Sequence, residues 1–554
     1  MKYKSLIITL LLLTGFNTAK SQLSDKELFD ISKNLDIFNS LFKELNMFYV
    51  DSIDAQKAIQ TAIKSMLEEL DPYTVYYPED KTEDLKFMTT GEYAGIGATI
   101  TERNGSIMIS EVYENMPAAV TGLQPGDELL EIDDESLKGK SSSYASEKLK
   151  GPAKTIVKIK YRRPGNKKDQ VVKIERNRIH VNSVPYYTVF NNNIGYIYLS
   201  SFTESSDQEL KQAFDELKRT GIESLILDVR DNGGGLLDDA VQIVNMFVPK
   251  GEVIVSTKGK FKQWDRTYRT VLSPIDIEIP LVVLVNGQSA SSAEILAGAL
   301  QDLDRAVLVG SRTYGKGLVQ STREVAYNGN LKVTISKYYI PSGRCIQAID
   351  YSHRKPDGSI GIIPDSLTTT FYTSKGRPVK DGGGITPDFS EEEQPLPNII
   401  YYLMMDYIFF DYATEWKNKH KTIGKAEDFS LSKADYESFK TFVKEKNFNY
   451  DRQSEKVLKS LKEIMEFEGY MESASKELDK LEEKLKPDLD RDLDKYKEQI
   501  AKQISLEILR RYYYQEGEII QSLKNDKQLE KALEVLSDPA LYNNTLRKDF
   551  QPAL

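Results

Sequence analysis

The sequence predicts a multidomain α+β protein in which an α/β core carries an inserted β-rich module, N-terminal helices and a C-terminal helical domain. Three observations lead to this fold class. The 554 residues exceed what a single hydrophobic core accommodates. Apolar strand-like runs alternate with helical stretches between residues 193 and 387. Beyond residue 397 the chain becomes charged and helical in its periodicity.

The chain begins with a segment typical of an export signal. Lysines precede a mainly apolar run over residues 6–16, and small residues follow within 19–21. The run is shorter than the roughly 20 residues of a membrane span, which favours a cleaved signal over the alternative of an uncleaved anchor. No cysteine follows the cleavage position, so a lipid anchor lacks its attachment residue. We expect an exported protein, soluble in the periplasm or cell envelope once residues 1–21 are removed.

Each later element follows from its hydrophobic pattern. Residues 25–70 place apolar side chains at helical spacing in two helices, and the turn Asp71-Pro72 ends the second. From about 91 to 176, short alternating runs broken by glycine and proline predict the β-rich module. In the core we expect strands over 194–199, 225–229, 281–285 and 306–309, and helices over 206–220, 236–247 and 292–303. Active groups in such folds lie on loops at strand ends.

The C-terminal region keeps one helix face apolar from Leu478 to Ile508, interrupted at Pro487. We interpret it as a helical packing or dimerisation domain, with a substrate-binding arm as the alternative. The composition also bears on which partners the protein binds. The 74 basic and 84 acidic residues give a net charge of −10 without a long basic block, which argues against nucleic acid or an anionic membrane as main partner. The lone Cys345 forms no internal disulfide, and nothing in the sequence calls for a metal or cofactor.

Two turns that follow strands of the core could carry chemistry: one is rich in glycine and the other in serine. Asp228-Val229-Arg230-Asp231-Asn232-Gly233-Gly234-Gly235 lets backbone N–H groups approach an oxyanion, with an ordinary glycine turn as the alternative. A nucleotide-phosphate loop is disfavoured, because no Gly-Lys-Ser/Thr follows. At Ser289-Ala290-Ser291-Ser292 a hydroxyl can be held beside free helix N–H groups, although serines are also common N-caps.

A serine nucleophile needs a base, which is usually histidine. The chain has His180, His353 and His420, and none lies in a glycine-rich strand-end motif. Lys316, between two glycines, makes a Ser-Lys dyad the more economical arrangement, with a Ser-His-Asp triad left as the alternative. A lysine base must be neutral, so its pKa has to fall from about 10.4 to 7 or 8, which burial can impose at roughly 3–5 kcal/mol. Gln320, at helical-turn spacing from Lys316, is predicted to orient the lysine through its amide oxygen.

Three motifs in this order resemble the C-terminal processing peptidases, also called tail-specific proteases: Arg230-x-Asn232-x-Gly234-Gly235, Ser289-Ala290-Ser291-x-x-Glu294 and Tyr314-Gly315-Lys316-Gly317-x-x-Gln320. The resemblance implies a ClpP/crotonase-like serine protease core with an inserted PDZ domain. It also implies Ser291 as nucleophile, Lys316 as base and Gln320 as the residue that orients it. The implied oxyanion hole is made by the backbone N–H groups of Ser292 and Gly234, and Ser289 and Ser292 are the rival nucleophiles.

The β-rich module fits the same family. Tyr93-Ala94-Gly95-Ile96-Gly97 resembles the PDZ loop whose N–H groups hold a terminal carboxylate, and residues 117–127 resemble the PDZ core signature. A glycine-rich hairpin that only packs is the alternative. PDZ capture adds the peptide as an extra strand, so the expected partners are protein substrates with exposed C-terminal tails. The family also implies that the PDZ domain can gate the active site.

The resemblance covers roughly residues 30–390, with two departures: an insertion at about 350–383 and the long helical tail. The expected domains are a signal peptide at 1–21, an N-terminal helical region at 22–84, a PDZ domain at 85–178, a serine protease core at 179–395 and a C-terminal helical domain at 396–554.

The sequence therefore predicts an exported serine endopeptidase that reads protein C-termini and processes or degrades envelope proteins. A homo-oligomer through the helical regions and an adaptor protein are further expected partners. One rival is a non-catalytic PDZ scaffold, against which the intact Ser291, Lys316 and Gln320 argue. A second rival is an acyl-CoA enzyme, because related α/β folds with glycine oxyanion loops bind thioesters. The export signal and the PDZ-like module disfavour it.

Overall fold

Two compact units make up the chain, and they divide between Tyr76 and Tyr77. The computed structural model describes residues 24–191, 193–354, 360–392, 395–450, 453–485 and 488–550. The expected signal peptide at 1–21 lies outside these residues. No helix in the described part of the chain has the length and apolar character needed to cross a membrane.

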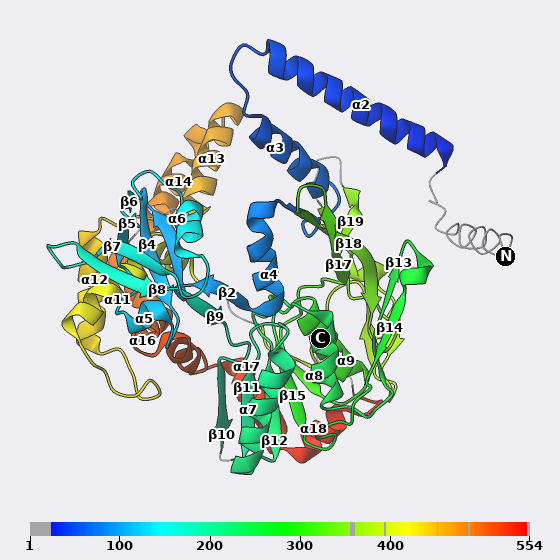
Figure 1. Ribbon diagram of the computed structural model, residues 1–554. Coiled ribbons are helices and arrows are strands. Elements are labelled where there is room, and N and C mark those ends of the chain that lie inside the picture. Colours follow the sequence, from blue (N-terminus) through cyan, green and yellow to red (C-terminus); the bar gives the residue numbers. More distant parts are fainter. Residues whose placement is uncertain are drawn as a thin grey trace. The chain divides into compact units, whose positions relative to one another are not determined.

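The first unit contains the two helices that the helical spacing predicts, α2 (Asp25–Phe48) and α3 (Ala55–Glu68) (Figure 1). Ser24 begins α2 with a capping box, in which the Ser24 N–H donates to Glu27 Oε2 over 2.7 Å. None of the α2 side chains is buried. Its exposed apolar residues include Leu28, Phe29, Ile31, Leu35, Phe38, Leu41 and Leu45. Strand β1 (Val75–Tyr77) spans the junction of the units.

A six-stranded sheet forms the centre of the second unit, in the order β10-β11-β12-β15-β16-β23. Its strands are β10 (Tyr186–Phe190), β11 (Ile194–Tyr198), β12 (Ser224–Asp228), β15 (Leu281–Val285), β16 (Val307–Gly310) and β23 (Phe389–Ser390). Only β10 runs antiparallel to its neighbour; the others are parallel. Every residue of β12 and β15 is buried, as in a parallel sheet covered on both faces. The predicted α/β core is therefore confirmed.

Three helices cover one face of this sheet: α7 (Ser206–Thr220), α8 (Leu237–Asn245) and α9 (Ser292–Asp302). They pack with the strand residues that point to that face, such as Leu225, Leu227 and Val283, in one hydrophobic core. The three helices expected from the sequence all form, and each begins within one residue of its expected start. Gly221 ends α7 in the left-handed conformation (φ 89°).

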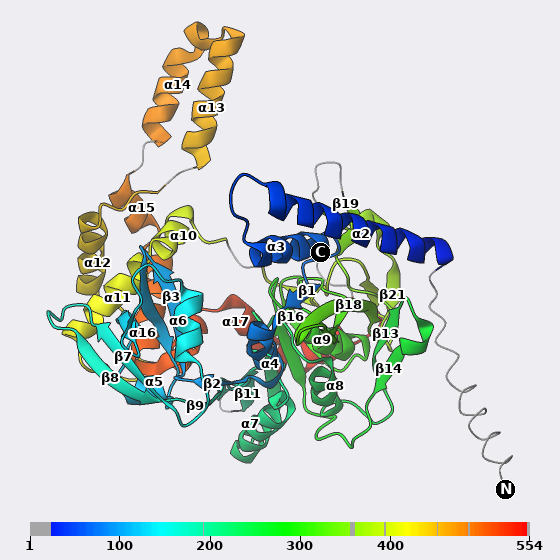
Figure 2. The same ribbon diagram turned by 45° about the horizontal axis from the view of Figure 1, so that its top comes forward.

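The last two helices, α17 (Lys527–Ser537) and α18 (Pro539–Thr545), cover the opposite face of the sheet. Leu529 and Val535 pack there against Ile226, Val282 and Leu284. Figures 1 and 2 both show α17 beside the sheet strands. An apolar helix stripe does not reveal which surface it covers, so the sequence did not predict this contact of the C-terminal region with the core sheet. The expected domain boundaries, 179–395 and 396–554, stay a prediction.

A second sheet carries the segment after Lys316. It has the order β17-β18-β13-β14, and its strands are β13 (Val253–Gly259), β14 (Arg266–Arg269), β17 (Leu318–Val325) and β18 (Gly329–Tyr339). Strands β17 and β18 pair antiparallel, with a bulge between Val319 and Gln320. The described part of the 350–383 insertion contributes two small hairpins. They are β19 (Ile349–Arg354) with β20 (Ile360–Ile362) and β21 (Thr370–Tyr372) with β22 (Pro378–Lys380).

In chain order, the β-rich module follows α4 (Thr82–Thr90) and precedes the core. Its main sheet has the order β3-β4-β5-β7-β8, with β6 on β5, and β2 pairs separately with β9. The elements are β2 (Glu92–Gly95), β3 (Ala98–Arg103), β4 (Ser106–Val112), α5 (Pro117–Val120), β5 (Glu128–Ile132), β6 (Glu135–Ser136), α6 (Ser142–Leu149), β7 (Ile156–Arg162), β8 (Gln170–Glu175) and β9 (Asn177–His180). Strand β3 forms one edge of the main sheet, next to α6. The predicted β-rich module is confirmed.

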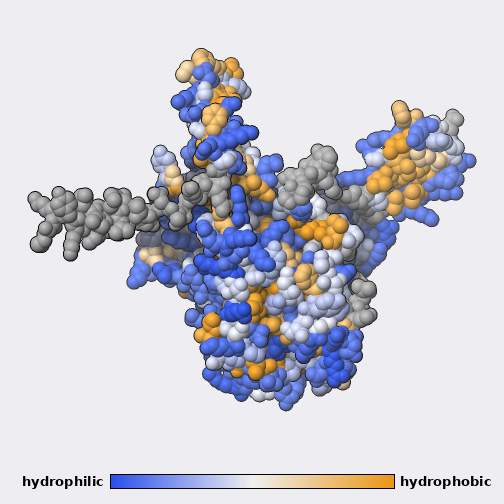
Figure 3. All heavy atoms as spheres, turned by 90° about the vertical axis from the view of Figure 1, so that its right-hand side faces the viewer, coloured by the Kyte–Doolittle hydropathy of each residue, from blue (hydrophilic) through white to orange (hydrophobic). Residues whose placement is uncertain are grey.

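A C-terminal group of helices has its own hydrophobic core, which includes Phe409, Phe439 and Ile504. The helices are α10 (Asn398–Met405), α11 (Ile408–Lys419), α12 (Lys433–Glu445), α13 (Gln453–Glu468), α14 (Met471–Leu485), α15 (Leu489–Lys495) and α16 (Lys497–Ser522). Helices α13 and α14 form a hairpin (Figure 2). Apolar side chains are exposed on it (Figure 3), among them Val457, Ile464, Phe467 and Tyr470.

The helical group also contacts the β-rich module. Arg103 on β3 binds Asp411 on α11 through two hydrogen bonds of 2.7 and 2.9 Å. Helix α16 bends at Tyr513 and Tyr514, and Tyr514 packs against the core of the module. The C-terminal region therefore holds the module at β3 as well as covering the central sheet.

Candidate active site

Ser291 lies at the sharp turn between β15 and α9. Its backbone has φ 55° and ψ −114°, a conformation that is costly for a residue with a side chain. Such a strained strand-to-helix turn holds a serine hydroxyl out from the sheet. The Ser291 side chain is partly exposed, in contrast to its two serine neighbours. The predicted nucleophile thus occupies a position that suits one.

The two rival serines use their hydroxyl groups inside the protein. Ser289 is fully buried; its hydroxyl donates to Val229 O over 2.7 Å and accepts the Asn286 N–H at 2.9 Å. Ser292 is 1% exposed, and its hydroxyl donates to Gly235 O over 2.9 Å. Its backbone N–H belongs to the first residue of α9, where a helix has no acceptor of its own to offer. This geometry favours Ser291 over both rivals.

A buried carboxylate, Glu294, connects the serine turn to the lysine loop. Glu294 Oε2 accepts the backbone N–H groups of Ser291 at 2.9 Å and of Lys316 at 2.8 Å. Glu294 Oε1 accepts the Thr313 hydroxyl at 2.6 Å and the Gly315 N–H at 2.7 Å. Burial raises the pKa of Glu294 to about 7, although all four of these donors lower it. From the sequence Glu294 was only a motif residue; the signal for its role is the Ser-x-x-Glu spacing of a capping box.

Tyr338 makes a second connection between the same two segments. Its buried hydroxyl lies 2.5 Å from Lys316 O and 3.1 Å from Ser291 O. It reaches them from β18, a strand that the sequence did not connect with the site. The carboxylate of Glu294 and the phenol of Tyr338 therefore bind the backbones of Ser291 and Lys316 together.

The glycines beside Lys316 allow a close approach of neighbouring chain. A Cβ on Gly315, which has φ 86°, would lie 2.3 Å from the Ala348 Cβ, and one on Gly317 would lie 2.8 Å from Gln347 N. The Lys316 side chain itself is partly buried. Both glycines are therefore required by packing, whichever way the lysine side chain turns.

Gln320 lies on strand β17, so its expected helical-turn relation to Lys316 is wrong. Its side-chain N–H donates to the Thr334 hydroxyl on the paired strand β18 over 3.2 Å. Only two residues of β17, Leu318 and Val319, precede the bulge. This run is too short for the sequence to distinguish a strand from a helical turn. The orienting role of Gln320 stays a prediction.

The glycine-rich loop packs directly on the serine turn. A Cβ on Gly234, which has φ 97°, would lie 2.7 Å from the Ser291 Cβ and 2.8 Å from Ala290 O. The Gly234 N–H donates to Asn232 Oδ1 over 2.8 Å, so this expected oxyanion donor already has a partner. Asn232 also accepts the Ala290 N–H at its backbone oxygen over 2.9 Å. Asn232 is thus a residue of the site whose role the sequence did not reveal.

The predicted peptide-binding loop is covered by its own tyrosine. Tyr93, Ala94 and Gly95 belong to β2, and Ile96 enters the core of the module. The Tyr93 ring lies over Gly95, where a Cβ would meet it at 2.8 Å. Burial raises the pKa of Tyr93 to about 12, while hydrogen bonds from the N–H groups of Ala98 and Gly97 to its hydroxyl oppose that rise. The phenol oxygen thus faces the Gly97 N–H, one of the donors expected to hold a terminal carboxylate, and that of Ala98, the residue after the expected loop.

The histidines have other partners. His180 on β9 lies 2.6 Å from Glu209 Oε1 through Nε2, and His420 stacks on Trp416 at 3.9 Å between ring centroids. The His353 side chain lies outside the described part of the structure. These contacts give the triad alternative no support from His180 or His420.

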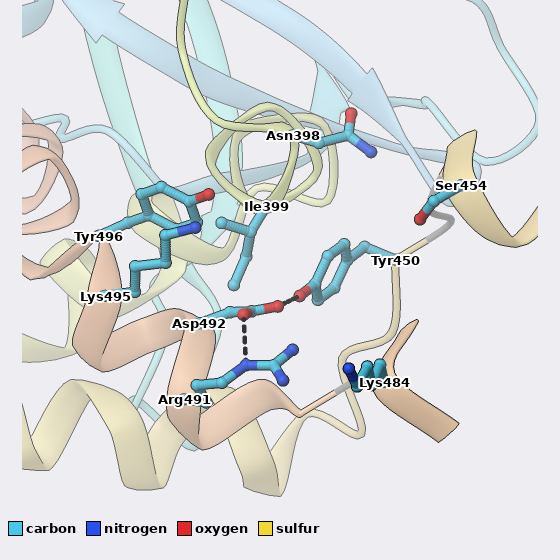
Figure 4. A pocket seen from close by; sticks show the side chains of 9 residues that line it. All are labelled: Asn398, Ile399, Tyr450, Ser454, Lys484, Arg491, Asp492, Lys495 and Tyr496. Carbon is cyan, nitrogen blue, oxygen red and sulfur yellow. Dashed lines mark hydrogen bonds and ion pairs between the residues drawn. The ribbon is translucent and has the colours of Figure 1, made fainter. Parts of the chain in front are cut away.

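A cavity of about 740 Å³ lies in the helical group, away from all these residues. Figure 4 shows its lining, where Asp492 accepts hydrogen bonds from the Tyr450 hydroxyl and from Arg491. None of the predicted site residues lines it. Among the described residues, no group of three or more His, Cys, Asp or Glu side chains is arranged to hold a metal ion.

Comparisons with known proteins identify three domains of the chain. Peptidase family S41 matches residues 193–367, a PDZ domain matches 108–163, and the C-terminal helical domain of probable PDZ-proteases matches 399–536. The carboxy-terminal-processing protease of Bartonella bacilliformis is 37% identical over 337 residues, which are 60% of this chain and 74% of that protein. A probable CtpA-like serine protease of Staphylococcus aureus is 35% identical over 344 residues, 62% of this chain and 66% of that one.

Among solved structures, a photosystem II D1 C-terminal processing protease is 29% identical, covers 58% of this chain and 84% of its own, and has a TM-score of 0.34. The PDZ domain of the Vibrio cholerae carboxy-terminal protease, solved with a peptide, is 26% identical over 16% of this chain and 99% of its own, with a TM-score of 0.15. The chain belongs to the carboxy-terminal-processing proteases, which are serine-type peptidases of family S41, and it combines their protease core with a PDZ domain and a C-terminal helical domain.

Proposed function

We propose that this protein is an exported serine endopeptidase that recognises protein C-termini through its PDZ domain and cleaves peptide bonds through an acyl-enzyme on Ser291, with Lys316 as base. Its proposed role is the processing or degradation of envelope proteins. One observation carries the proposal: Glu294 and Tyr338 each bind the backbones of both Ser291 and Lys316. Holding two reacting groups in fixed register is a large part of what an active site supplies.

The proposed reaction proceeds in two halves. The neutral Lys316 amine takes the proton of the Ser291 hydroxyl as its Oγ attacks the scissile carbonyl carbon. The C–N bond then breaks, the lysine ammonium returns the proton to the leaving amine, and an ester on Ser291 remains. Water, deprotonated by Lys316, then attacks that ester; the bond from the acyl carbon to Ser291 Oγ breaks, the lysine ammonium returns its proton to Oγ, and the new carboxyl terminus is released. Gln320 is proposed to orient the lysine.

The oxyanion of each half needs two donors. The Ser292 N–H, at the start of α9, is the first. Gly234 is the second, and its N–H has to leave Asn232 Oδ1 to serve the oxyanion. Gly234 lies beside the Ser291 side chain, since a Cβ on it would be 2.7 Å from the Ser291 Cβ, and its peptide plane is proposed to rotate so that the N–H points to the oxyanion.

Recognition of substrate is proposed to occur at β3 of the PDZ domain. This edge strand can accept a peptide as an additional strand beside α6. The substrate carboxylate is proposed to bind the backbone N–H groups of the loop 93–97, after displacing the Tyr93 hydroxyl from Gly97 and Ala98.

Export and assembly complete the proposal. Export follows from the signal-like residues 1–21, and the exposed apolar side chains of α2 support a homo-oligomer through the helical regions. An adaptor protein remains a proposed partner. Light scattering of the purified protein measures the oligomer directly.

Cleavage of an unstructured substrate with an apolar C-terminus tests the activity. We expect the parent and the variants Ser289→Ala and Ser292→Ala to cleave it, and Ser291→Ala and Lys316→Ala to lose cleavage at least 1,000-fold. The same substrate with an amidated C-terminus should be cut more slowly, because the PDZ loop has lost its carboxylate. A parent that binds tails without cutting them would favour the non-catalytic PDZ scaffold, and cleavage by Ser291→Ala would refute the nucleophile.

A further inference from the structure

Arg230 links the glycine-rich loop to the C-terminal end of the chain. Its guanidinium binds Asp228 through Nε, at 3.0 Å from both carboxylate oxygens, and through a second nitrogen at 2.5 Å. Its remaining nitrogen donates to Asp526 Oδ2 over 2.6 Å and to Gln528 Oε1 over 3.0 Å. The Arg230 and Asp526 side chains are each 12% exposed, so water screens this pair weakly.

Asp526 has a second role, as the N-cap of α17. Its other oxygen, Oδ1, accepts the N–H groups of Gln528 at 3.0 Å and Leu529 at 3.1 Å. Helix α17 is in turn fixed on the central sheet by Leu529 and Val535. The carboxylate that faces Arg230 is therefore held by a packed helix rather than by a loose tail.

On its other side, Arg230 directly precedes the residues that form the oxyanion loop. Asp231 exchanges two hydrogen bonds of 3.0 Å with the Asn286 side chain. Asn232 donates to Leu199 O over 2.7 Å and accepts the Gly234 N–H. Three residues, 231–233, thus separate Arg230 from the proposed oxyanion donor Gly234, and two of them, Asp231 and Asn232, are hydrogen-bonded to neighbouring segments.

We propose that Asp526 is a positioning residue of the active site: through Arg230 it sets the position of the oxyanion loop, so that the C-terminal helix α17 takes part in catalysis. This inference rests on the proposed function. Without the Asp526 charge the guanidinium keeps Asp228, whose Oδ2 also accepts the Tyr196 hydroxyl at 2.7 Å, and swings away from α17. The displacement reaches Gly234 through Asp231 and Asn232.

The variant Asp526→Asn separates the capping of α17 from the ion pair with Arg230. Asparagine caps helices as well as aspartate does, but it has no negative charge to pair with Arg230. We expect kcat for tail cleavage to fall about tenfold with KM within about twofold of the parent, since substrate binding is untouched. Asp538→Asn is the matched control. Asp538 caps α18 in the same way, accepting Ala540 N at 2.9 Å and Leu541 N at 3.1 Å, and we expect its kcat to stay within about twofold of the parent.

A third variant distinguishes positioning from mere stability. Asp526→Glu keeps the charge but is a poor N-cap, so its thermal midpoint should lie below that of Asp526→Asn while its kcat lies above. Activities that follow the order of stability would overturn the inference, as would an Asp526→Asn kcat equal to the parent. If Asp526→Asn does not fold, Asp526→Ser, a neutral and shorter cap, takes its place with the same expected loss. A parent without cleavage refutes the proposed function, whereas an active parent with an unaffected variant refutes only the role of Asp526.

Discussion

The backbone N–H groups of Ser291 and Lys316 donate to the same carboxylate oxygen, Glu294 Oε2, at 2.9 and 2.8 Å. The two residues lie on separate loops that follow different strands of the sheet. This buried oxygen, together with the Tyr338 hydroxyl, therefore sets the spacing between the backbones of the proposed nucleophile and its base.

Glu294→Gln should uncouple the two loops. The amide NH₂ of glutamine replaces one acceptor oxygen, so at least one backbone N–H loses its partner, at a cost of about 2 kcal/mol in unfolding free energy. We expect kcat to fall roughly 100-fold because the dyad is displaced. Asp388→Asn is the control: Asp388 is a buried carboxylate that accepts the Leu308 N–H at 2.8 Å, outside the site. Equal activity losses in the two variants, per folded molecule, would contradict the prediction.

The same carboxylate predicts a pH dependence. Because burial raises the pKa of Glu294 from 4.5 to about 7, the folded protein holds its proton more tightly than the unfolded chain. The associated stability is fully present below pH 4.5 and is lost as the pH rises through 7. Activity should change in the opposite direction, since only the ionised carboxylate accepts all four donors. Denaturant unfolding and kcat/KM between pH 5 and 8 measure both trends, and a parent whose stability changes with pH as that of Glu294→Gln does would contradict the assignment.

Gly234→Ala should abolish activity while leaving a folded protein. A Cβ at this position meets the Ser291 Cβ at 2.7 Å, so the oxyanion loop must move away from the serine turn. We expect a loss of about 100-fold or more in kcat. Gly221→Ala provides the control, because Gly221 also has a positive φ, 89°, but has open space around it. It should lower the thermal midpoint and retain kcat, and a similar kcat for both variants would contradict the role given to Gly234.

Tyr93→Phe should strengthen the binding of tail peptides. Removing the hydroxyl frees the Gly97 and Ala98 N–H groups, so a peptide carboxylate no longer competes with it. We expect up to about tenfold tighter binding in fluorescence anisotropy, equivalent to roughly 1 kcal/mol, and no gain for the amidated peptide. Tyr161→Phe removes a phenol that donates to Gln170 at 2.8 Å elsewhere in the domain and should leave the affinity unchanged. Weaker binding by Tyr93→Phe would indicate that the hydroxyl assists the peptide instead.

Much of the central sheet could be predicted from the sequence because its strands are buried on both faces. The run Leu281–Val285 is apolar throughout, and the structure gives it these same bounds. The site residues predicted this way, Ser291, Lys316 and Gly234, all follow such strands. Their motifs are local, so a short window of sequence contains them.

The features of the fold and the candidate site that could not be predicted from the sequence depend on contacts between distant segments. Tyr338 reaches the site from β18, and nothing near it in sequence resembles a catalytic motif. Leu529 and Val535 have an ordinary helical spacing that fits any apolar surface, so their place on the central sheet was not predictable. The spacing of Lys316 and Gln320 suited a helix, but pairing with β18 made it a strand.

The position of α17 and α18 has a consequence for how the protein is made. These helices are among the last residues of the chain, yet they cover Ile226, Val282 and Leu284 at its centre. While the chain folds, that face of the sheet stays uncovered until α17 and α18 pack on it. A chain cut short before residue 526 keeps Ser291 and Lys316 but lacks both the helices that cover the sheet and the Asp526 carboxylate that faces Arg230. We therefore expect the proposed active site to take its final form only after α17 and α18 have packed on the central sheet.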